Sequence, residues 1–135
     1  MKVLIVDDDA MNRKLFRVLL QGSGYATIEA ENGEEAVKTA KEKKPDLILM
    51  DIRMPVMDGI TAFKALRRED ATKDIPVIAL TSYAMKGDRE RYMAEGFDDY
   101  ISKPIDKNGF IITAKRLLEQ RIRGMEIRCK NNPKS

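Results

Sequence analysis

Four parts of the chain place a chemically active side chain directly after a short apolar run. The pairs are residues 3–6 before Asp7, Asp8 and Asp9, residues 47–50 before Asp51, residues 77–80 before Thr81, and residues 100–102 before Lys103. Short apolar runs separated by helical patterns are typical of buried parallel strands. In an open parallel sheet the ligand site forms outside the carboxyl ends of the strands. The sequence therefore predicts that carboxylates, a hydroxyl and an ammonium group meet at one edge of a sheet.

The predicted cluster has more acidic than basic side chains. Two carboxylates about 4 Å apart repel by roughly 4 kcal/mol at an effective dielectric constant near 20. A bound cation relieves this repulsion most simply, so we expect the cluster to hold one.

The segments between the apolar runs have the spacing of amphipathic helices. Two sets of residues fall at i, i+4, i+7 and i+8, which places each set on one helical face. They are Met11, Leu15, Val18 and Leu19 near the start of the chain, and Phe110, Ala114, Leu117 and Leu118 near its end. We expect Gly22 and Gly24 to end the first of these helices, and the last helical pattern to stop at Gly124.

Polar residues at the predicted helix starts indicate caps. Asp9, Asn32 and Asp58 are each placed to cap a helix, and Glu35 follows Asn32 at the spacing of a capping box. A markedly charged helix is predicted over residues 86–95, and a weaker second strand over residues 25–30. Strands that alternate with helices imply right-handed crossovers. The predicted fold is therefore an α/β (βα)5 doubly wound sandwich, a five-stranded parallel sheet with helices on both faces.

Composition and length narrow the possible functions. The 135 residues suit one domain, with 43% hydrophobic and 35% charged residues. No apolar stretch approaches the roughly 20 residues of a membrane helix, and no secretory signal is evident. Cys129 is the single cysteine, which fits a reducing, cytoplasmic setting. The absence of histidine excludes a Ser-His-Asp or Cys-His nucleophile, so any phosphohistidine donor must be another protein.

Charge is unevenly distributed along the chain. Five basic residues and one acidic residue follow Gln120, which gives this end a net charge of +4 and leaves −1 for the rest. We divide the chain into a domain over residues 1–121 and a short basic tail over residues 122–135. A tail of this kind usually remains solvated; nucleic-acid binding by the tail is an alternative, and no nucleic acid or membrane is expected as a partner.

The residues at the strand ends resemble those of the receiver domain of two-component response regulators, over residues 1 to about 120. The matching stretches are Val6-Asp7-Asp8, Met50-Asp51-Ile52-Arg53-Met54-Pro55-Val56-Met57-Asp58-Gly59, Ala79-Leu80-Thr81-Ser82 and Ile101-Ser102-Lys103-Pro104. Residues 97–105 are most similar to single-domain regulators and to receivers attached to hybrid histidine kinases. The resemblance implies a flavodoxin-like sheet with strand order 2-1-3-4-5.

The resemblance also implies a role for each residue of the predicted cluster. Asp51 would be the phosphoacceptor, with Lys103 and Thr81 contacting phosphoryl oxygens and the small Ser82 leaving room for them. Mg²⁺, or Mn²⁺ as a substitute, would be bound by Asp8 and Asp51, by Asp7 largely through water, and by the Arg53 carbonyl. The Lys103–Pro104 bond would be cis. Arg53 and Tyr83 would tune how long the phosphoryl group lasts.

A signalling role follows from the same resemblance. Thr81 and Tyr100 would form a switch that changes the face built by the fourth helix, fifth strand and last helix. The phosphoryl donor would be a sensor histidine kinase or a histidine phosphotransfer protein, and the output would be contact with another protein. On this interpretation the chain is not an enzyme, although it assists its own phosphorylation and dephosphorylation.

Other functions are compatible with parts of the pattern. Asp7 and Asp9 have the spacing of a haloacid dehalogenase-type phosphatase, with Asp7 as nucleophile and Asp9 as acid/base, but Ala10 and the lack of a cap insertion depart from that family. A nucleotide-binding domain would need a Gly-rich loop after the first strand, and none is present. A receiver that serves as a scaffold and never accepts phosphate remains a third alternative.

Overall fold

The computed structural model of the chain describes residues 1–54, 56–81 and 87–131, with side chains as far as residue 124. The predicted lifetime-tuning residue Tyr83, its neighbour Ser82 and the last four residues of the tail lie outside the described residues. The strands are β1 (Lys2–Val6), β2 (Ala26–Ala30), β3 (Leu47–Asp51), β4 (Val77–Thr81) and β5 (Asp99–Ser102). The helices are α1 (Ala10–Gly22), α2 (Gly33–Lys43), α3 (Gly59–Arg68), α4 (Asp88–Glu95) and α5 (Lys107–Asn131).

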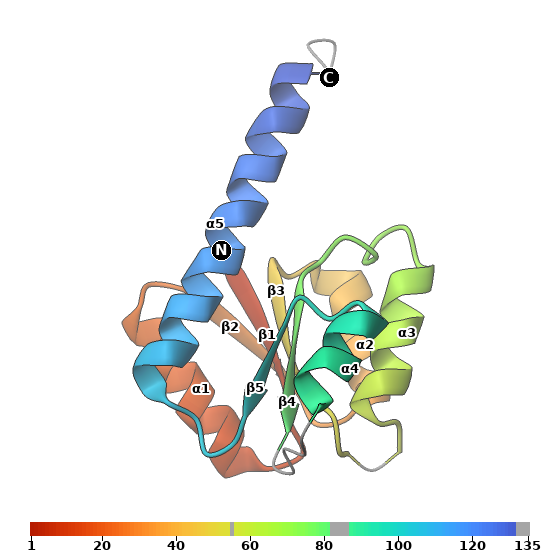
Figure 1. Cartoon of the computed structure of the whole chain (residues 1–135), viewed down its shortest axis with the longest axis vertical. Coiled ribbons are helices and arrows are strands. Elements are labelled where there is room, and N and C mark those ends of the chain that lie inside the picture. Colours follow the sequence, from red (N-terminus) through yellow and green to blue (C-terminus); the bar gives the residue numbers. More distant parts are fainter. Residues whose placement is uncertain (55, 82–86, 132–135) are drawn as a thin grey trace.

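The five strands form one parallel sheet in the order β2-β1-β3-β4-β5, which confirms the predicted fold and strand order. Helices cover both faces of this sheet (Figure 1). Helices α1 and α5 pack on one face around Phe16 and Phe110, whose rings lie 5.2 Å apart. Helices α2, α3 and α4 pack on the other face, where Phe63 and Phe97 stack at 3.9 Å. The central strands β3 and β4 are buried along their full length, as their unbroken apolar runs predict.

The predicted caps are present at three helices. Asp9 accepts a hydrogen bond from the Met11 amide, Asn32 from the Glu35 amide and Asp58 from the Thr61 amide. The Glu35 carboxylate accepts from the Glu31 amide at 3.4 Å rather than from Asn32, so only half of the predicted capping box forms. These caps fix where the chain turns from a loop into each helix.

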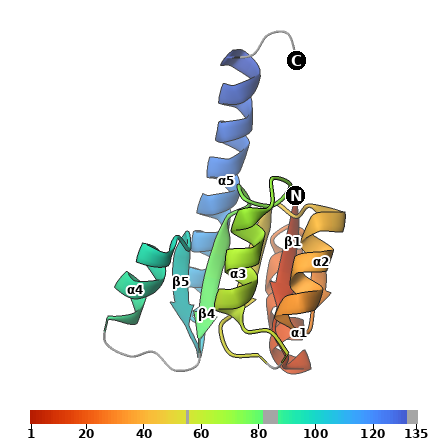
Figure 2. The same cartoon turned by 90° about the vertical axis from the view of Figure 1, so that its right-hand side faces the viewer.

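The last helix is longer than the sequence pattern predicts. It continues through Gly124 to Asn131, and Figures 1 and 2 show it projecting beyond the end of the sheet. A glycine costs a helix only about 1 kcal/mol relative to alanine, which the helix-forming residues on either side can offset. Arg121, the last residue of the predicted domain, lies 3.5 Å from the Asp46 carboxylate and donates to the Asp74 carbonyl. The boundary between domain and tail at residue 121 remains a prediction.

Smaller differences concern element ends. Strand β2 begins at Ala26 rather than Tyr25, and helix α4 begins at Asp88 within the described residues. Gly96 ends α4 with a φ of 110°, a conformation that favours glycine. In the described part of the chain, no helix has the length and apolar character needed to cross a membrane.

Candidate functional site

The carboxyl ends of β1 and β3 and the residue that follows β5 bring the predicted chemical groups together. An open pocket of about 260 Å³ forms there. Its lining residues are Asp7, Asp8, Asp9, Asn12, Asp51, Arg53 and Lys103. Parallel strands place their carboxyl ends at one edge, which is why residues far apart in sequence meet in this pocket.

Three carboxylates form the acidic centre of the pocket. Asp7 and Asp51 are buried, whereas Asp8 is exposed, and one oxygen of each lies within 4.8 Å of the others. Asp7 is further held by the Asp9 amide, which donates to its Oδ1 at 3.0 Å. Three oxygen ligands at this spacing, one of them open to solvent, are the donor set that a hard divalent cation prefers.

Lys103 places a positive charge beside two of these carboxylates. Its Nζ donates to Asp7 Oδ2 at 2.8 Å and lies 3.7 Å from Asp51 Oδ2. The Lys103 amide donates to the Thr81 carbonyl at 2.7 Å, which ties this residue to the end of β4. The Lys103–Pro104 peptide bond is cis. One ammonium group therefore faces two buried carboxylates.

The environment of Asp51 disfavours its ionised form. Burial and the neighbouring Asp7 carboxylate raise the pKa of Asp51 to about 7, although Lys103 and the Arg53 amide act in the opposite direction. The Arg53 amide donates to Asp51 Oδ1 at 3.3 Å. Additional positive charge in this pocket would favour the carboxylate form of Asp51.

Gly59 permits the close packing around Asp51. A Cβ atom at Gly59 would lie 2.2 Å from the Asp51 carbonyl oxygen and 2.9 Å from the Ile52 Cα. Any other residue would push α3 away from the end of β3. The sequence contained this signal as the Asp58-Gly59 pair, but its packing reason appears only in the structure.

Thr81 and Tyr100 lie on adjacent strands. Thr81 is 3% exposed and pairs with Ser102, while Ala79 pairs with Tyr100. Alternation along β4 therefore puts Thr81 and Tyr100 on the same face of the sheet, as diagonal neighbours. The Tyr100 ring stacks on Tyr92 at 5.5 Å, and its hydroxyl is buried without a hydrogen-bond partner among the described residues. The Tyr100 ring therefore packs against α4 in this structure.

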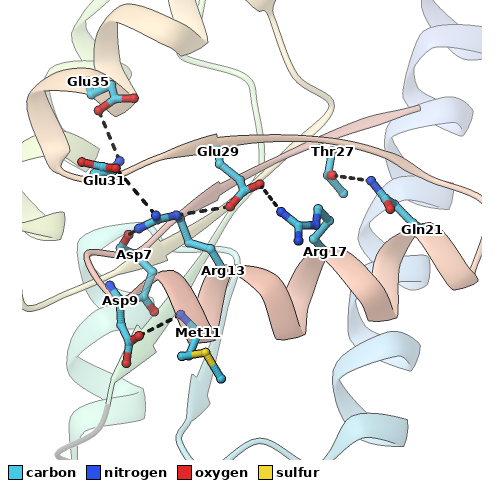
Figure 3. Close-up of polar contacts among 10 residues, drawn as sticks. All are labelled: Asp7, Asp9, Met11, Arg13, Arg17, Gln21, Thr27, Glu29, Glu31 and Glu35. Atoms are coloured by element: carbon cyan, nitrogen blue, oxygen red, sulfur yellow. Dashed lines mark hydrogen bonds and ion pairs between the residues drawn. The ribbon is translucent and has the colours of Figure 1, made fainter.

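Two groups of residues were missed by the sequence analysis. Buried Asp99 is paired with Arg89 at 3.1 Å and Arg116 at 2.6 Å, which joins α4 and α5 to β5. Arg13 extends from α1 to the Asp7 carbonyl and to two glutamates, as Figure 3 shows. No motif marks these arginines, since their partners are distant in sequence and charged residues are common on exposed helix faces.

Comparison with known proteins identifies the family. The family model of the response regulator receiver domain matches residues 3–116. The polar-differentiation response regulator DivK of Brucella anthropi is 51% identical over 116 residues, covering 86% of this chain and 94% of that protein. DivK of Brucella ovis is 49% identical over the same shares of both chains.

Solved structures give the same result. The receiver domain of the Francisella response regulator 1452 has a TM-score of 0.82 at 30% identity, covering 88% of this chain and 97% of that one. The receiver domain of sensor histidine kinase PA1611 from Pseudomonas aeruginosa, solved with a magnesium ion coordinated in its active site cleft, has a TM-score of 0.80 at 33% identity. That match covers 87% of this chain and 97% of the other.

None of these matches supports the phosphatase alternative, and Asp9 serves here as the exposed cap of α1. The family match spans most of the chain, the relatives share about half of its residues, and the acidic cluster lies at the strand ends. This chain belongs to the response regulator receiver domains, the phosphorylation-dependent switches of two-component signalling.

Proposed function

We propose that this receiver accepts a phosphoryl group from a partner phosphohistidine onto Asp51. A carboxylate oxygen of Asp51 attacks phosphorus, the bond from phosphorus to the imidazole nitrogen breaks, and an acyl phosphate forms. The supporting observation is the position of Asp51, which is buried at the end of β3 and opens into the acidic pocket. These 135 residues contain no histidine, which supports a histidine kinase or histidine phosphotransfer domain as the donor.

The proposal includes a divalent cation, most simply Mg²⁺ with Mn²⁺ as a substitute. Oxygens of Asp7, Asp8 and Asp51 are close enough together to share one ion, with the Arg53 carbonyl as a further ligand. When bound, the ion would neutralise negative charge on the phosphoryl group and on the carboxylates. The magnesium described for the PA1611 receiver supports this assignment by analogy.

Lys103 and Thr81 would act on the phosphoryl oxygens. Phosphoryl transfer spreads charge over these oxygens, so a fixed ammonium and a hydroxyl can stabilise the transition state. Lys103 Nζ is already 3.7 Å from Asp51 Oδ2, within reach of a group attached there. The same residues would assist loss of the phosphoryl group to water, with Arg53 and Tyr83 tuning its lifetime.

The proposed output is a change in the face formed by α4, β5 and α5. A hydrogen bond from Thr81 to the phosphoryl group would draw this side chain toward Asp51, and the space it leaves would let Tyr100 rotate inward. Tyr100 stacks on Tyr92 of α4, so a movement of Tyr100 would change how that helix packs. The partner that reads this face would be another protein, and the setting would be cytoplasmic.

Metal-dependent labelling tests the proposal. With acetyl phosphate and Mg²⁺, intact-mass spectrometry should show a gain of about 80 Da, one phosphoryl group. Asp51→Asn should abolish the gain, as should removal of the metal with EDTA. Asp58→Asn is the matched control, because it changes an exposed aspartate that caps α3 outside the pocket and should label normally. Unaltered labelling of Asp51→Asn would refute the assignment.

A further inference from the structure

Arg13 of α1 makes the polar contact that supports the acidic pocket from outside. Its Nη1 donates at 2.8 Å to the backbone carbonyl of Asp7, a residue that lines the pocket. Its Nε contacts Glu29 of β2 at 3.2 Å, and its Nη2 lies 3.7 Å from Glu31, the residue that follows this strand (Figure 3). The side chain is only 13% exposed, which is low for an arginine on a surface helix.

These contacts connect β2 and the residue after it to the backbone of the proposed metal-binding carboxylates. Glu29 is itself held by Arg17 at 3.0 Å, and the Glu31 backbone amide donates to the Glu35 carboxylate at 3.4 Å. At the other end, the Asp7 carbonyl directly precedes Asp8, the exposed carboxylate of the cluster. A planar guanidinium can make several such contacts at once with a fixed geometry.

We infer that Arg13 is a positioning residue that holds Asp7 and Asp8 in place for a divalent cation. The inference rests on the proposed metal site, and Arg13 itself touches neither the ion nor the phosphoryl group. Loss of the Arg13 contact would free the loop between β1 and α1 and spread the carboxylates over several arrangements. Contacts that orient metal ligands typically change metal affinity by about 10- to 100-fold.

Electrostatics alone predicts that removing Arg13 strengthens Mg²⁺ binding, whereas lost positioning predicts that it weakens binding. This difference makes the inference testable. Removing the Arg13 guanidinium takes away a positive charge near the cluster and leaves Glu29 with one cation fewer. Both changes make the pocket more negative and would strengthen the binding of Mg²⁺. Weaker binding after this substitution can therefore be attributed to lost positioning rather than to lost charge.

Calorimetric titration of the metal-free full chain with Mg²⁺ is the decisive experiment. Arg13→Gln should raise the Kd by about tenfold. Arg17→Gln is the matched control, because Arg17 binds the same Glu29 but makes no contact with Asp7 among the described residues, and its Kd should stay within about twofold of the parent. Labelling by acetyl phosphate should show the same pattern, with Arg13→Gln slow at low Mg²⁺ and restored at saturating Mg²⁺.

Each outcome of the titration either supports or overturns the role of Arg13. An unchanged or lower Kd in Arg13→Gln, or an equal rise in Arg17→Gln, overturns the inference. A parent chain that binds no Mg²⁺ would overturn the proposed metal site and the inference together. Should Arg13→Gln fail to fold, Arg13→Lys carries the test, because an ammonium group keeps the charge but cannot span Asp7 and Glu29, and a Kd rise of about threefold or more is expected.

Discussion

Asp51 and Asp99 are both buried carboxylates of the sheet, yet their charge environments are opposite. Asp51 shares one ammonium group, Lys103, with Asp7, and the Asp8 carboxylate lies beside both. Asp99 instead has two guanidinium groups, Arg89 and Arg116, and its Oδ1 also accepts a hydrogen bond from the Tyr100 amide.

This difference separates a functional site from a structural one. The Asp99 cluster is complete without any ligand, so it serves to join α4 and α5 to β5. The Asp51 cluster places three carboxyl groups beside one ammonium group, and positive charge that enters the pocket would stabilise it. An unbalanced cluster at the carboxyl edge of the sheet is thus a better indicator of function than buried charge alone.

The largest expected effect follows from removing the ammonium group of Lys103, which faces Asp7 and Asp51. Lys103→Met should reduce labelling by acetyl phosphate at saturating Mg²⁺ by about 100-fold, because a fixed charge near the phosphoryl oxygens is lost. Intact-mass time courses measure this rate. Lys107→Met, at an exposed lysine of α5, should label like the parent, and similar rates for the two variants would contradict the role of Lys103.

The metal-free protein should lose stability as pH rises. Because the folded pKa of Asp51, about 7, lies above the ordinary value of 3.8, the folded state binds more protons than the unfolded state between these pH values. Stability contributed by protonated Asp51 is therefore lost as pH increases toward 7 and beyond. Between about pH 5.5 and pH 8 we expect a loss on the order of 2 kcal/mol in EDTA.

Urea unfolding of the parent chain and of Asp51→Asn at the two pH values measures this effect. The asparagine variant should lack the pH-dependent loss, and added Mg²⁺ should remove it from the parent. The chain has no histidine, so few other side chains titrate in this range. Equal pH dependence in both proteins would show that Asp51 is not the titrating group.

Asp99→Asn tests the balanced cluster. The substitution leaves Arg89 and Arg116 without their carboxylate and should lower the free energy of unfolding by on the order of 2 kcal/mol, since both arginines are partly hydrated. Labelling of residue 51 by acetyl phosphate should be unchanged. A large loss of labelling with no loss of stability would show that Asp99 acts in phosphorylation and not in holding the fold together.

The smallest effect is expected at Asp9, which is acidic but caps α1. Asp9→Ala should cost about 1 kcal/mol of stability through loss of the contact with the Met11 amide. The labelling rate should stay within about twofold, as expected for a cap that binds no phosphoryl group. Thermal melting measures the stability and intact-mass time courses measure the labelling rate. A strong loss of labelling would show that Asp9 takes part in the chemistry.

The residues at the strand ends could be predicted from the sequence, whereas the side-chain contacts around them could not. The positions of Asp7, Asp51 and Lys103 could be predicted because parallel strands align their carboxyl ends whatever the helices do. The contacts of Arg13 and Asp99 could not be predicted, because the partner of a long arginine side chain depends on how the helices pack against the sheet.

The helix starts could be predicted from the sequence, but the end of the last helix could not. Asp9 and Asp58 were predictable caps, since a cap depends on a few neighbouring residues. The continuation of α5 through Gly124 was not, because one glycine is a weak signal and the helix also gains from Arg121 contacting Asp46 across the fold.

The most direct test of the account is to locate the phosphoryl group on the chain. Labelled protein can be treated with borohydride, which reduces an acyl phosphate to an alcohol, and then digested and sequenced by mass spectrometry. The account predicts that the reduced residue is Asp51, and only when Mg²⁺ or Mn²⁺ was present during labelling. Reduction at Asp7 or Asp8, or metal-independent labelling of Asp51, would contradict it.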